Sequence, residues 1–239
     1  EHRICLPSGK IKHIEASGQF ETGPDGKPTF IEGTIQDISE KVYHREELRR
    51  LAYEDPLTKL PNRRAVEEKL RHEVAQSGRQ GAHLFLALID LDNFREPNER
   101  YGSALGDDLL IAISQQIRTV CGDSAFVARM GGDEFAVILS RMNEDDDFFS
   151  LFRRLMVTIS EPINLSDIDI KMTSSIGITQ YPQPEKVSEE QLLRQAQQAL
   201  YQAKMQGKNR LQQYDIQWEQ CTKALTGQFE AIRQALIDE

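Results

Sequence analysis

The chain has 239 residues, of which 39% are hydrophobic, and a formal net charge of -9 at pH 7. This acidic balance excludes a broad nucleic-acid-binding surface, which needs clustered Lys and Arg. No apolar run approaches the roughly 18 residues that cross a bilayer, and the N-terminus does not resemble a signal peptide. We therefore expect a cytoplasmic chain that contacts neither nucleic acid nor membrane, although a longer parent protein could be anchored upstream.

Residues 1–38 contain two runs typical of β-strands, IKHIEASGQF and PTFIEGTIQDI. The clusters PSGK and GPDGKP around them are rich in turn-forming residues, which separate antiparallel strands. So short a stretch does not form a stable sheet by itself. We expect it to be the final part of a domain that begins upstream.

Residues 39–54 are predicted to form a mostly charged helix, with Asp37 or Ser39 as its N-cap and Pro56 closing it. Two interpretations of this helix stay open, a solvated linker and a dimeric signalling helix. The stretch is too short to show the sustained heptads that would decide between them. Its clearest apolar positions are Leu48, Leu51 and Ala52.

From residue 63 onward, hydrophobic periodicity predicts helices and strands in regular succession. Helices are predicted over 63–74, 104–120, 147–160 and 192–204, and strands over 84–90, 125–130, 135–139 and 170–178. The order between residues 84 and 178 is β-α-β-β-α-β, which is that of ferredoxin-like folds. We predict an α+β domain with this core, one helix before it and another after it.

The stretch RMGGDEFAVIL at 129–139 places two glycines and two carboxylates between two of these strands. Gly131 and Gly132 permit positive φ in a tight hairpin and leave the backbone open to a bulky ligand. Asp133 and Glu134 follow at once. A bare GGDE is more often a simple hairpin turn, so its meaning depends on the surrounding sequence.

In the ferredoxin-like order, strand 84–90 runs beside the hairpin, and its C-terminal end reaches Asp90 and Asp92. These carboxylates can therefore converge with those of the hairpin. Because neighbouring strand residues face opposite ways, we expect only one hairpin carboxylate to share a metal shell with Asp90. Carboxylate oxygens suit Mg²⁺, which completes its shell with phosphates and water.

Five motifs resemble those of the GGDEF family of diguanylate cyclases in order and separation: DPLTKLPNRRA, LIDLDNFREPNERYGSALGDDLL, VARMGGDEFAVIL, SSIGIT and ALYQAKMQGKN. The resemblance covers residues 55–214 and implies a fold similar to nucleotidyl cyclases and polymerase palms. Residues 1–38, in the run that ends in GTIQDISE, resemble the last strands of a PAS sensor domain. Residues 215–239 resemble the helical lead-in to an EAL phosphodiesterase domain.

The resemblance implies that two GTP molecules condense into cyclic di-GMP with release of pyrophosphate, each subunit of a homodimer presenting one GTP. It implies Mg²⁺ (or Mn²⁺) as cofactor, bound by Asp90, the Leu91 carbonyl and Asp133. Glu134 would support the metal or deprotonation of the 3′-hydroxyl, and Arg95, at a position usually held by lysine, would also be catalytic.

The residues that the resemblance implies in substrate binding are Phe94, Asn98, Asp107, Gly131, Gly132, Lys204 and Lys208. Asn98 and Asp107 match the positions that read guanine, and a carboxylate can accept hydrogen bonds from guanine N1–H and the exocyclic amine. Lys204 and Lys208 match the cations that hold the triphosphate.

The sequence departs from the family pattern at several positions. Pro97 replaces a usual isoleucine beside Asn98, and we expect it to alter that loop because proline fixes φ and removes an amide donor. Lys59 stands where a glycine is usual. The RxxD site that binds cyclic di-GMP would need Arg and Asp where Gly122 and Ala125 stand, so we predict no product inhibition through it.

Two functional hypotheses follow. In the first, the domain is a cyclase whose rate depends on how the PAS segment and the 39–54 helix bring two domains face to face. In the second, the domain binds GTP without appreciable synthesis and controls a downstream EAL phosphodiesterase. A third interpretation, in which the chain serves only as a dimerisation module, predicts no GTP binding.

Overall fold

The computed structural model describes residues 1–22, 28–80, 83–142 and 147–215. Its contacts divide the chain into two compact units, Glu1–Tyr53 and Glu54–Glu239. The predicted lead-in at 215–239 lies, apart from its first residue, outside the described part. No helix of the described ranges is both long enough and apolar enough to cross a bilayer.

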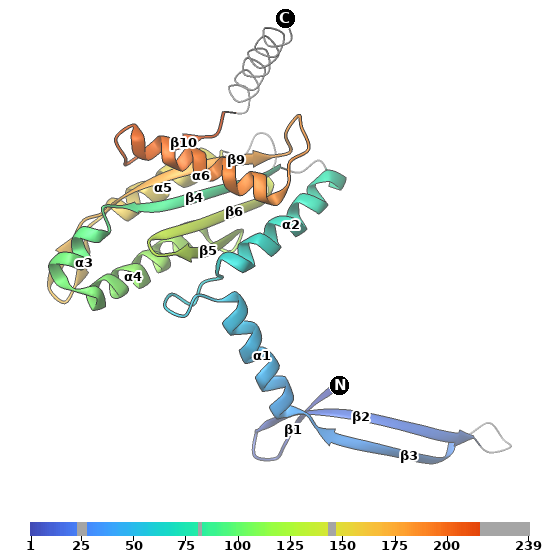
Figure 1. Cartoon of the computed structure of the whole chain (residues 1–239). Coiled ribbons are helices and arrows are strands. Elements are labelled where there is room, and N and C mark those ends of the chain that lie inside the picture. The colour runs from blue at the N-terminus through green and yellow to red at the C-terminus, as the bar shows by residue number, and fades with distance from the viewer. Residues whose placement is uncertain (23–27, 81–82, 143–146, 216–239) are drawn as a thin grey trace, which may run out of the picture. The chain divides into compact units, whose positions relative to one another are not determined.

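The first unit is a three-stranded antiparallel sheet of order β1-β2-β3, followed by helix α1 (Figure 1). Its elements are β1 (His2–Cys5), β2 (Ile11–Thr22), β3 (Pro28–Asp37) and α1 (Ser39–Tyr53). The Asp37 carboxylate accepts a hydrogen bond from the Ser39 amide at 3.0 Å, which confirms the predicted start of this helix. Leu48 and Leu51 are 67% and 68% exposed, and both interpretations of α1 stay open.

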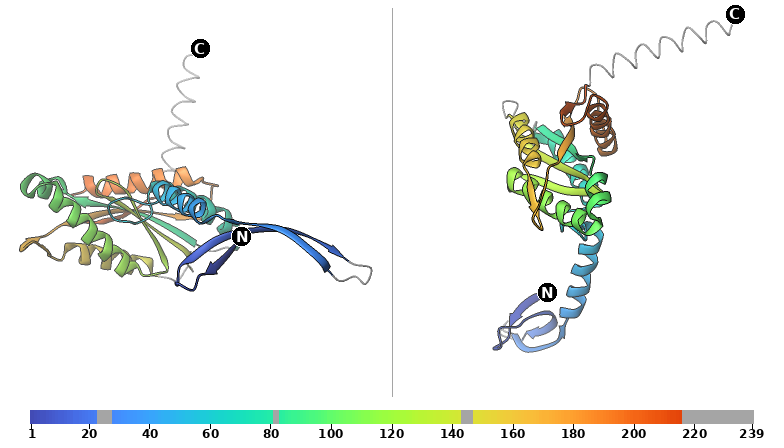
Figure 2. Two further views of the ribbon diagram at one scale, coloured as in Figure 1. Left: turned by 90° about the horizontal axis from the view of Figure 1, so that it is seen from below. Right: turned by 90° about the vertical axis from the view of Figure 1, so that its left-hand side faces the viewer.

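The second unit is built on a five-stranded mixed sheet of order β10-β9-β4-β6-β5 (Figure 1). Its strands are β4 (His83–Asp92), β5 (Ala125–Gly131), β6 (Glu134–Met142), β9 (Thr173–Tyr181) and β10 (Leu211–Gln213). Helices α2 (Arg63–Gln80) and α6 (Glu189–Met205) cover one face, and α4 (Ser103–Cys121) and α5 (Phe148–Ser160) cover the other (Figure 2). The predicted α+β, ferredoxin-like order is confirmed.

Strand β4 lies at the centre of this sheet, between β6 and β9. Its residues alternate between two apolar cores. Phe85, Ala87 and Ile89 face α4 and α5, whereas Leu84, Leu86 and Leu88 face α2 and α6. Because the alternation continues along the strand, Asp90 points to the α2 and α6 side, at the end where the apolar core stops.

Three short features were not predicted: helix α3 (Arg95–Tyr101), the hairpin of β7 (Ile163–Leu165) and β8 (Ile168–Ile170), and strand β10. Pro97 does not break α3, because it lies in the first turn, where helix N–H groups have no intrahelical acceptor. The loop expected around Asn98 is therefore a short helix.

Helix α6 packs very closely on β9 at Gly177. A Cβ atom at this position would lie 2.1 Å from the Leu200 backbone nitrogen and 2.3 Å from the Ala196 carbonyl oxygen. Because backbone atoms cannot give way as a flexible side chain can, only glycine fits here. This contact sets the height of α6 above the sheet.

We expect Gly177→Ala to lower the free energy of unfolding by about 3 kcal/mol, since the methyl group would force the helix off the strand. Gly122→Ala is a suitable control, because its Cβ would meet open space and only the left-handed backbone, with φ of 65°, would be strained. Because its φ of 65° and ψ of -168° lie in a region that is almost restricted to glycine, that control should cost about 1–2 kcal/mol. Denaturant unfolding measures both, and equal losses would contradict a close contact at Gly177.

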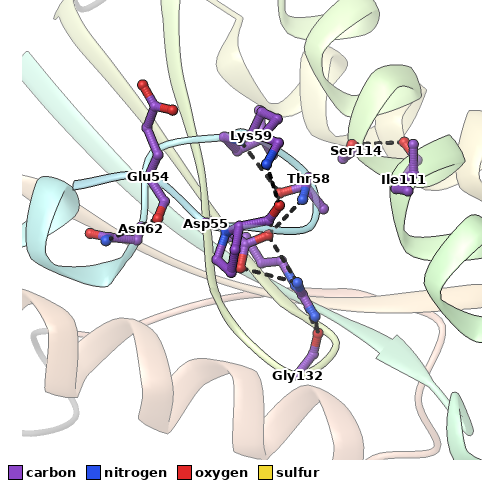
Figure 3. Close-up of polar contacts among 11 residues, drawn as sticks. Glu54, Asp55, Thr58, Lys59, Asn62, Ile111, Ser114 and Gly132 are labelled. Carbon is purple, nitrogen blue, oxygen red and sulfur yellow. Dashed lines mark hydrogen bonds and ion pairs between the residues drawn. The ribbon is translucent and has the colours of Figure 1, made fainter. Parts of the chain in front are cut away.

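The loop that precedes α2 is organised around the Asp55 carboxylate (Figure 3). Asp55 Oδ1 accepts hydrogen bonds from the Thr58 amide at 2.7 Å and the Thr58 hydroxyl at 2.8 Å. The Arg129 guanidinium donates to both oxygens of Asp55, at 2.9 and 3.1 Å. The same guanidinium donates to the Gly132 carbonyl oxygen at 3.0 and 2.7 Å, which fastens the turn between β5 and β6 to this loop.

The Asp55–Arg129 ion pair is largely buried, with side chains 14% and 10% exposed. Burial opposes ionisation of Asp55, but the hydrogen bonds from Thr58 and Arg129 outweigh it and hold the pKa of this carboxyl below its ordinary value. A carboxyl whose folded-state pKa is depressed stabilises the fold above its unfolded pKa of about 3.9. This stabilisation is lost as the pH falls below that value.

We expect Asp55→Ala to lower the free energy of unfolding by about 3–5 kcal/mol, because it leaves the Arg129 guanidinium buried without its carboxylate. Thermal unfolding of Asp55→Asn should also show a smaller drop in Tm than the wild type between about pH 5 and about pH 3. Parallel Tm curves for the wild type and Asp55→Asn would show that this carboxyl does not couple stability to pH.

Candidate active site

Two carboxylates face each other across the β4–β6 ladder. Asp90, near the end of β4, is in register with Glu134, the first residue of β6. Directly opposite residues of an antiparallel pair lie on the same face of a sheet, so both side chains point to the α2 and α6 side. Asp133 lies in the turn just before them, where its carbonyl oxygen accepts a hydrogen bond from the Leu91 amide at 3.3 Å.

The two facing carboxylates are partly buried, and burial is the first cause that disfavours the ionisation of both. The pKa of Asp90 lies above its ordinary value, first because of burial and also because of the Asp133 charge, although the Lys204 ammonium opposes both effects. Burial and the Asp90 charge likewise raise the pKa of Glu134. Within the described residues, Glu134 Oε1 is buried without a hydrogen-bond partner. This concentration of negative charge favours a bound cation.

Lys204, in the last turn of α6, contacts this cluster directly, with its Nζ 2.6 Å from Asp90 Oδ2. Helix α6 stops where predicted, and Gly207 follows it with φ of 114°. Lys208 comes next, and its ammonium donates a hydrogen bond to the side-chain oxygen of Asn93, just beyond β4. The structure therefore places both predicted phosphate-binding lysines at the same edge of the sheet as the carboxylates.

The carboxylates offer only oxygen donors to a metal ion. Among the residues that the structure describes, no group of three or more His, Cys, Asp or Glu side chains forms a ready-made metal site. Asp90 and Asp133 instead supply two carboxylates, and the Leu91 side chain is buried in the core, so only its backbone is available to a ligand. A few protein oxygens, completed by phosphates and water, fit Mg²⁺ or Mn²⁺.

Asp92 lies near this cluster, since its charge also raises the pKa of Asp90, but its own carboxylate is bonded to other segments. Its side chain is only 6% exposed. It accepts hydrogen bonds from the hydroxyls of Thr173 and Ser175, each at 2.7 Å, and from the Asn209 amide at 3.0 Å. These partners could not be predicted from the sequence, because only the pairing of β4 with β9 brings Thr173 and Ser175 beside Asp92, and Asn209 is 117 residues away in the chain.

Asn98 in α3 lies against Gly106 near the start of α4. A Cβ atom at Gly106 would lie 1.8 Å from Asn98 Oδ1, so the Asn98 side chain occupies space that only a glycine leaves free. Asp107, the next residue, is exposed. The two residues predicted to read guanine thus lie on adjoining helices, with Gly106 between them.

The remaining predicted residues lie around this edge in different environments. Phe94 immediately precedes α3 and packs partly buried against the core under α4 and α5. Arg95 is 87% exposed and pairs with Glu99 of its own helix at 2.6 Å, so the structure does not bring its charge to the carboxylates. Gly131 and Gly132 have φ of 132° and 55°, and a Cβ at either would meet no atom within 4 Å.

A pocket of about 390 Å³ opens beside Glu134, between α2 and α6. Its lining includes the basic side chains of Arg63, Arg71 and Arg194 and the acidic side chains of Glu67, Glu189 and Glu190. Arg71 and Glu189 form an ion pair at 2.9 Å. Because its lining carries charges of both signs, this pocket does not select strongly for an anion or a cation.

Comparisons with known proteins agree with this geometry. Residues 52–210 match the family model described as diguanylate cyclase, GGDEF domain. The bifunctional diguanylate cyclase/cyclic di-GMP phosphodiesterase MucR of Pseudomonas aeruginosa is 39% identical over 163 residues, which are 68% of this chain and 24% of MucR. The cyclic di-GMP phosphodiesterase NbdA of the same organism is 38% identical over 193 residues, which are 80% of this chain and 24% of NbdA.

Solved structures give the same result. The coiled coil and GGDEF domain of DgcB from Caulobacter crescentus, in complex with c-di-GMP, superposes with a TM-score of 0.67 at 28% identity, covering 74% of this chain and 93% of that one. The GGDEF domain of TpbB from Pseudomonas aeruginosa gives 0.66 at 32% identity, covering 72% and 99%. This chain spans about a quarter of the length of the curated relatives MucR and NbdA. By sequence and fold, it belongs to the GGDEF family of diguanylate cyclase domains.

Proposed function

We propose that this domain condenses two GTP molecules into cyclic di-GMP at the interface of a homodimer. In each of two equivalent steps, the 3′-hydroxyl of one GTP attacks the α-phosphate of the other. One P–O bond forms, the bond to the leaving pyrophosphate breaks, and the hydroxyl proton goes to a base. The observation that carries this proposal is the convergence of Asp90, Glu134 and Lys204 at one sheet edge beside the GGDE turn.

The proposed metal ligands are Asp90, Asp133 and the carbonyl of Leu91. Mg²⁺ (or Mn²⁺), when bound, would supply positive charge to the phosphates and activate the attacking hydroxyl. Glu134 would support this metal or accept the proton of the 3′-hydroxyl. A carboxylate with a raised pKa accepts a proton more readily than one with an ordinary pKa. The raised pKa of Glu134 therefore supports its role as the base that accepts the 3′-hydroxyl proton.

We assign the proposed substrate contacts from the positions at which these residues match the family motifs. Lys204 and Lys208 would hold the triphosphate as point charges, and Asn98 with Asp107 would read guanine. The open space above Gly131 and Gly132 would let the nucleotide approach the hairpin backbone. Phe94 would contact the substrate, and Arg95 would be catalytic only after leaving Glu99, which an exposed surface ion pair permits at little energetic cost.

We further propose that residues 1–38 are the end of a PAS domain, that α1 connects it to the cyclase domain, and that a phosphodiesterase domain of the EAL type follows in the parent protein. The names of MucR and NbdA, both of which include phosphodiesterase activity, support the last point. The proposed cellular location is the cytoplasm.

A second candidate function is a GTP-binding domain that regulates a phosphodiesterase without appreciable synthesis. The observation that favours it is the 38% identity to NbdA, which is named only as a phosphodiesterase. Under this alternative, GTP occupancy would change the activity of the following domain, and the carboxylates would serve binding rather than turnover.

Incubation of the chain with GTP and Mg²⁺, followed by chromatography of the nucleotides, tests the first proposal. We expect cyclic di-GMP to form with a specific rate that rises with protein concentration, because two domains must meet. Asp133→Ala should reduce this rate by about 100-fold or more, the size typical of losing one electrostatic stabiliser of a transition state. Asp123→Ala, an exposed carboxylate in the connection before β5, is the matched control and should retain the rate.

The outcomes separate the two functions. If Asp133→Ala formed product at the wild-type rate, the assignment of Asp133 as a metal ligand would be wrong. GTP binding by calorimetry without any product, at all protein concentrations, would support the regulatory function instead. Absence of GTP binding would contradict both.

Gly106→Ala tests the guanine-reading assignment. The added methyl group would displace the Asn98 side chain, and a misplacement of about 1 Å in a recognition group can cost about 100-fold. We expect GTP affinity, measured by calorimetry, to fall at least tenfold, with no further loss in the Gly106→Ala/Asn98→Ala double variant. Wild-type affinity in Gly106→Ala would show that Asn98 does not read the base.

A further inference from the structure

We propose that Asp92 is a positioning residue for phosphate binding, which acts by fixing the turn that carries Lys208 rather than by binding metal. The inference rests on the proposed function, since it concerns how the domain holds the triphosphate of GTP. It assigns a role to the second carboxylate at the end of β4.

The hydrogen bonds of Asp92 occupy both carboxylate oxygens. Oδ1 accepts from the Ser175 hydroxyl at 2.7 Å, and Oδ2 accepts from the Thr173 hydroxyl at 2.7 Å and from the Asn209 amide at 3.0 Å. The two hydroxyls come from β9, which pairs with β4 along its whole length. The carboxylate is therefore held in one orientation by a rigid strand, and it presents Oδ2 to the turn after α6.

This turn has an unusual backbone. Gly207, Lys208 and Asn209 have φ of 114°, 60° and 45°, so three successive residues lie in the left-handed region, two of them not glycine. Such a conformation persists only where surrounding contacts determine it. The amide of Asn209 is bonded to Asp92, and the carbonyl of the next residue, Arg210, accepts from the Ile176 amide at 2.9 Å. These two bonds tie the turn to β4 and β9.

Lys208 depends on this arrangement because it lies one residue before the bonded amide. Its ammonium reaches the side-chain oxygen of Asn93, the residue that follows Asp92. The side chain of Lys208 is therefore held by Asn93, and its backbone is held through the neighbouring Asn209 amide by Asp92. Both contacts lie at the end of β4, near the carboxylates of the site. A flexible lysine whose backbone is fixed presents its charge to a phosphate at a smaller entropic cost.

The contacts of Asp92 are less typical of a metal ligand than the contacts of Asp90. Asp90 contacts a cation, Lys204, at 2.6 Å and faces another carboxylate across the ladder. Asp92 contacts two hydroxyls and an amide, all neutral donors. A metal ion would have to use the lone pair of Oδ1 that Ser175 leaves free, on a residue that is only 6% exposed.

Asp92→Asn separates these roles, because the amide keeps the volume but removes the charge and one of the two accepting oxygens. At least one of the three hydrogen bonds is then lost, and those that remain have a neutral acceptor and are weaker. We expect the KM and the calorimetric Kd for GTP to rise about tenfold with little change in kcat. In a Lys208→Ala background, the same change should have no further effect on Kd. Hydrogen exchange of the amides at 206–210 should accelerate in Asp92→Asn without GTP present.

Each alternative gives a different result. A metal ligand would lose kcat and require more Mg²⁺, and its effect would persist in the Lys208→Ala background. A merely structural residue would lower the Tm and leave Kd and KM unchanged. Either result would overturn the inference.

Thr173→Val provides a second variant if Asp92→Asn does not fold, since it removes one hydroxyl donor from the same Oδ2 atom. It should raise the Kd for GTP about twofold to threefold and accelerate exchange at 206–210. Unchanged Kd and exchange would overturn the inference while leaving the proposed function intact. Absence of GTP binding by the wild type would overturn the proposed function itself, and with it the inference.

Discussion

The pairing register of β4 with β6 is the constraint on which the rest of the site depends. It sets Asp90 opposite Glu134 on one face, at the point where the apolar core under α2 and α6 ends. Two carboxylates so close together, both partly buried, are costly unless a cation lies nearby. Lys204 of α6 supplies one such positive charge through its ion pair with Asp90. The close contact of α6 with β9 at Gly177 holds the helix at the distance from the sheet at which this ion pair forms.

Carboxylates in this domain divide into two kinds according to their contacts. Asp55 and Asp92 accept several hydrogen bonds each and hold loops in place: Asp55 through Arg129 holds the hairpin turn, and Asp92 contacts the turn after α6. Asp90 and Glu134 instead have raised pKa values, caused first by burial. A raised pKa next to like charge is typical of a functional site, whereas a buried carboxylate that accepts several hydrogen bonds from other segments holds those segments in place.

The sequence predicted the long elements well, because their periodicity is strong. The order of the core and the position of Asp90 beside the hairpin followed from the near-continuous apolar run at 84–90 and from the ferredoxin-like pattern. The short features α3, the β7–β8 hairpin and β10 were missed, since three to seven residues carry too little periodicity to register.

Long-range polar contacts were missed for a different reason. Asp55 and Arg129 are 74 residues apart, and Asp92 and Asn209 are 117 apart, so no local pattern links them. One departure did carry structural information. Lys59 stands at a usual glycine position, and its φ of 59° shows why glycine suits that place, since a side chain there strains the backbone.

The balance of charge at the sheet edge indicates how ligands must enter it. The charges that act on this edge are those of four carboxylates and three cations, and Lys204 is already paired with Asp90. The carboxylates are Asp90, Asp92, Asp133 and Glu134, and the cations are Arg63, Lys204 and Lys208. A triphosphate that arrived alone would meet net negative charge and would have to compete with Asp90 for Lys204. A divalent cation held by Asp90 and Asp133 would remove both difficulties, because it would compensate the charge of the carboxylates and leave Lys204 available to the phosphates. Metal and nucleotide should therefore bind with positive cooperativity, and neither should bind as tightly alone.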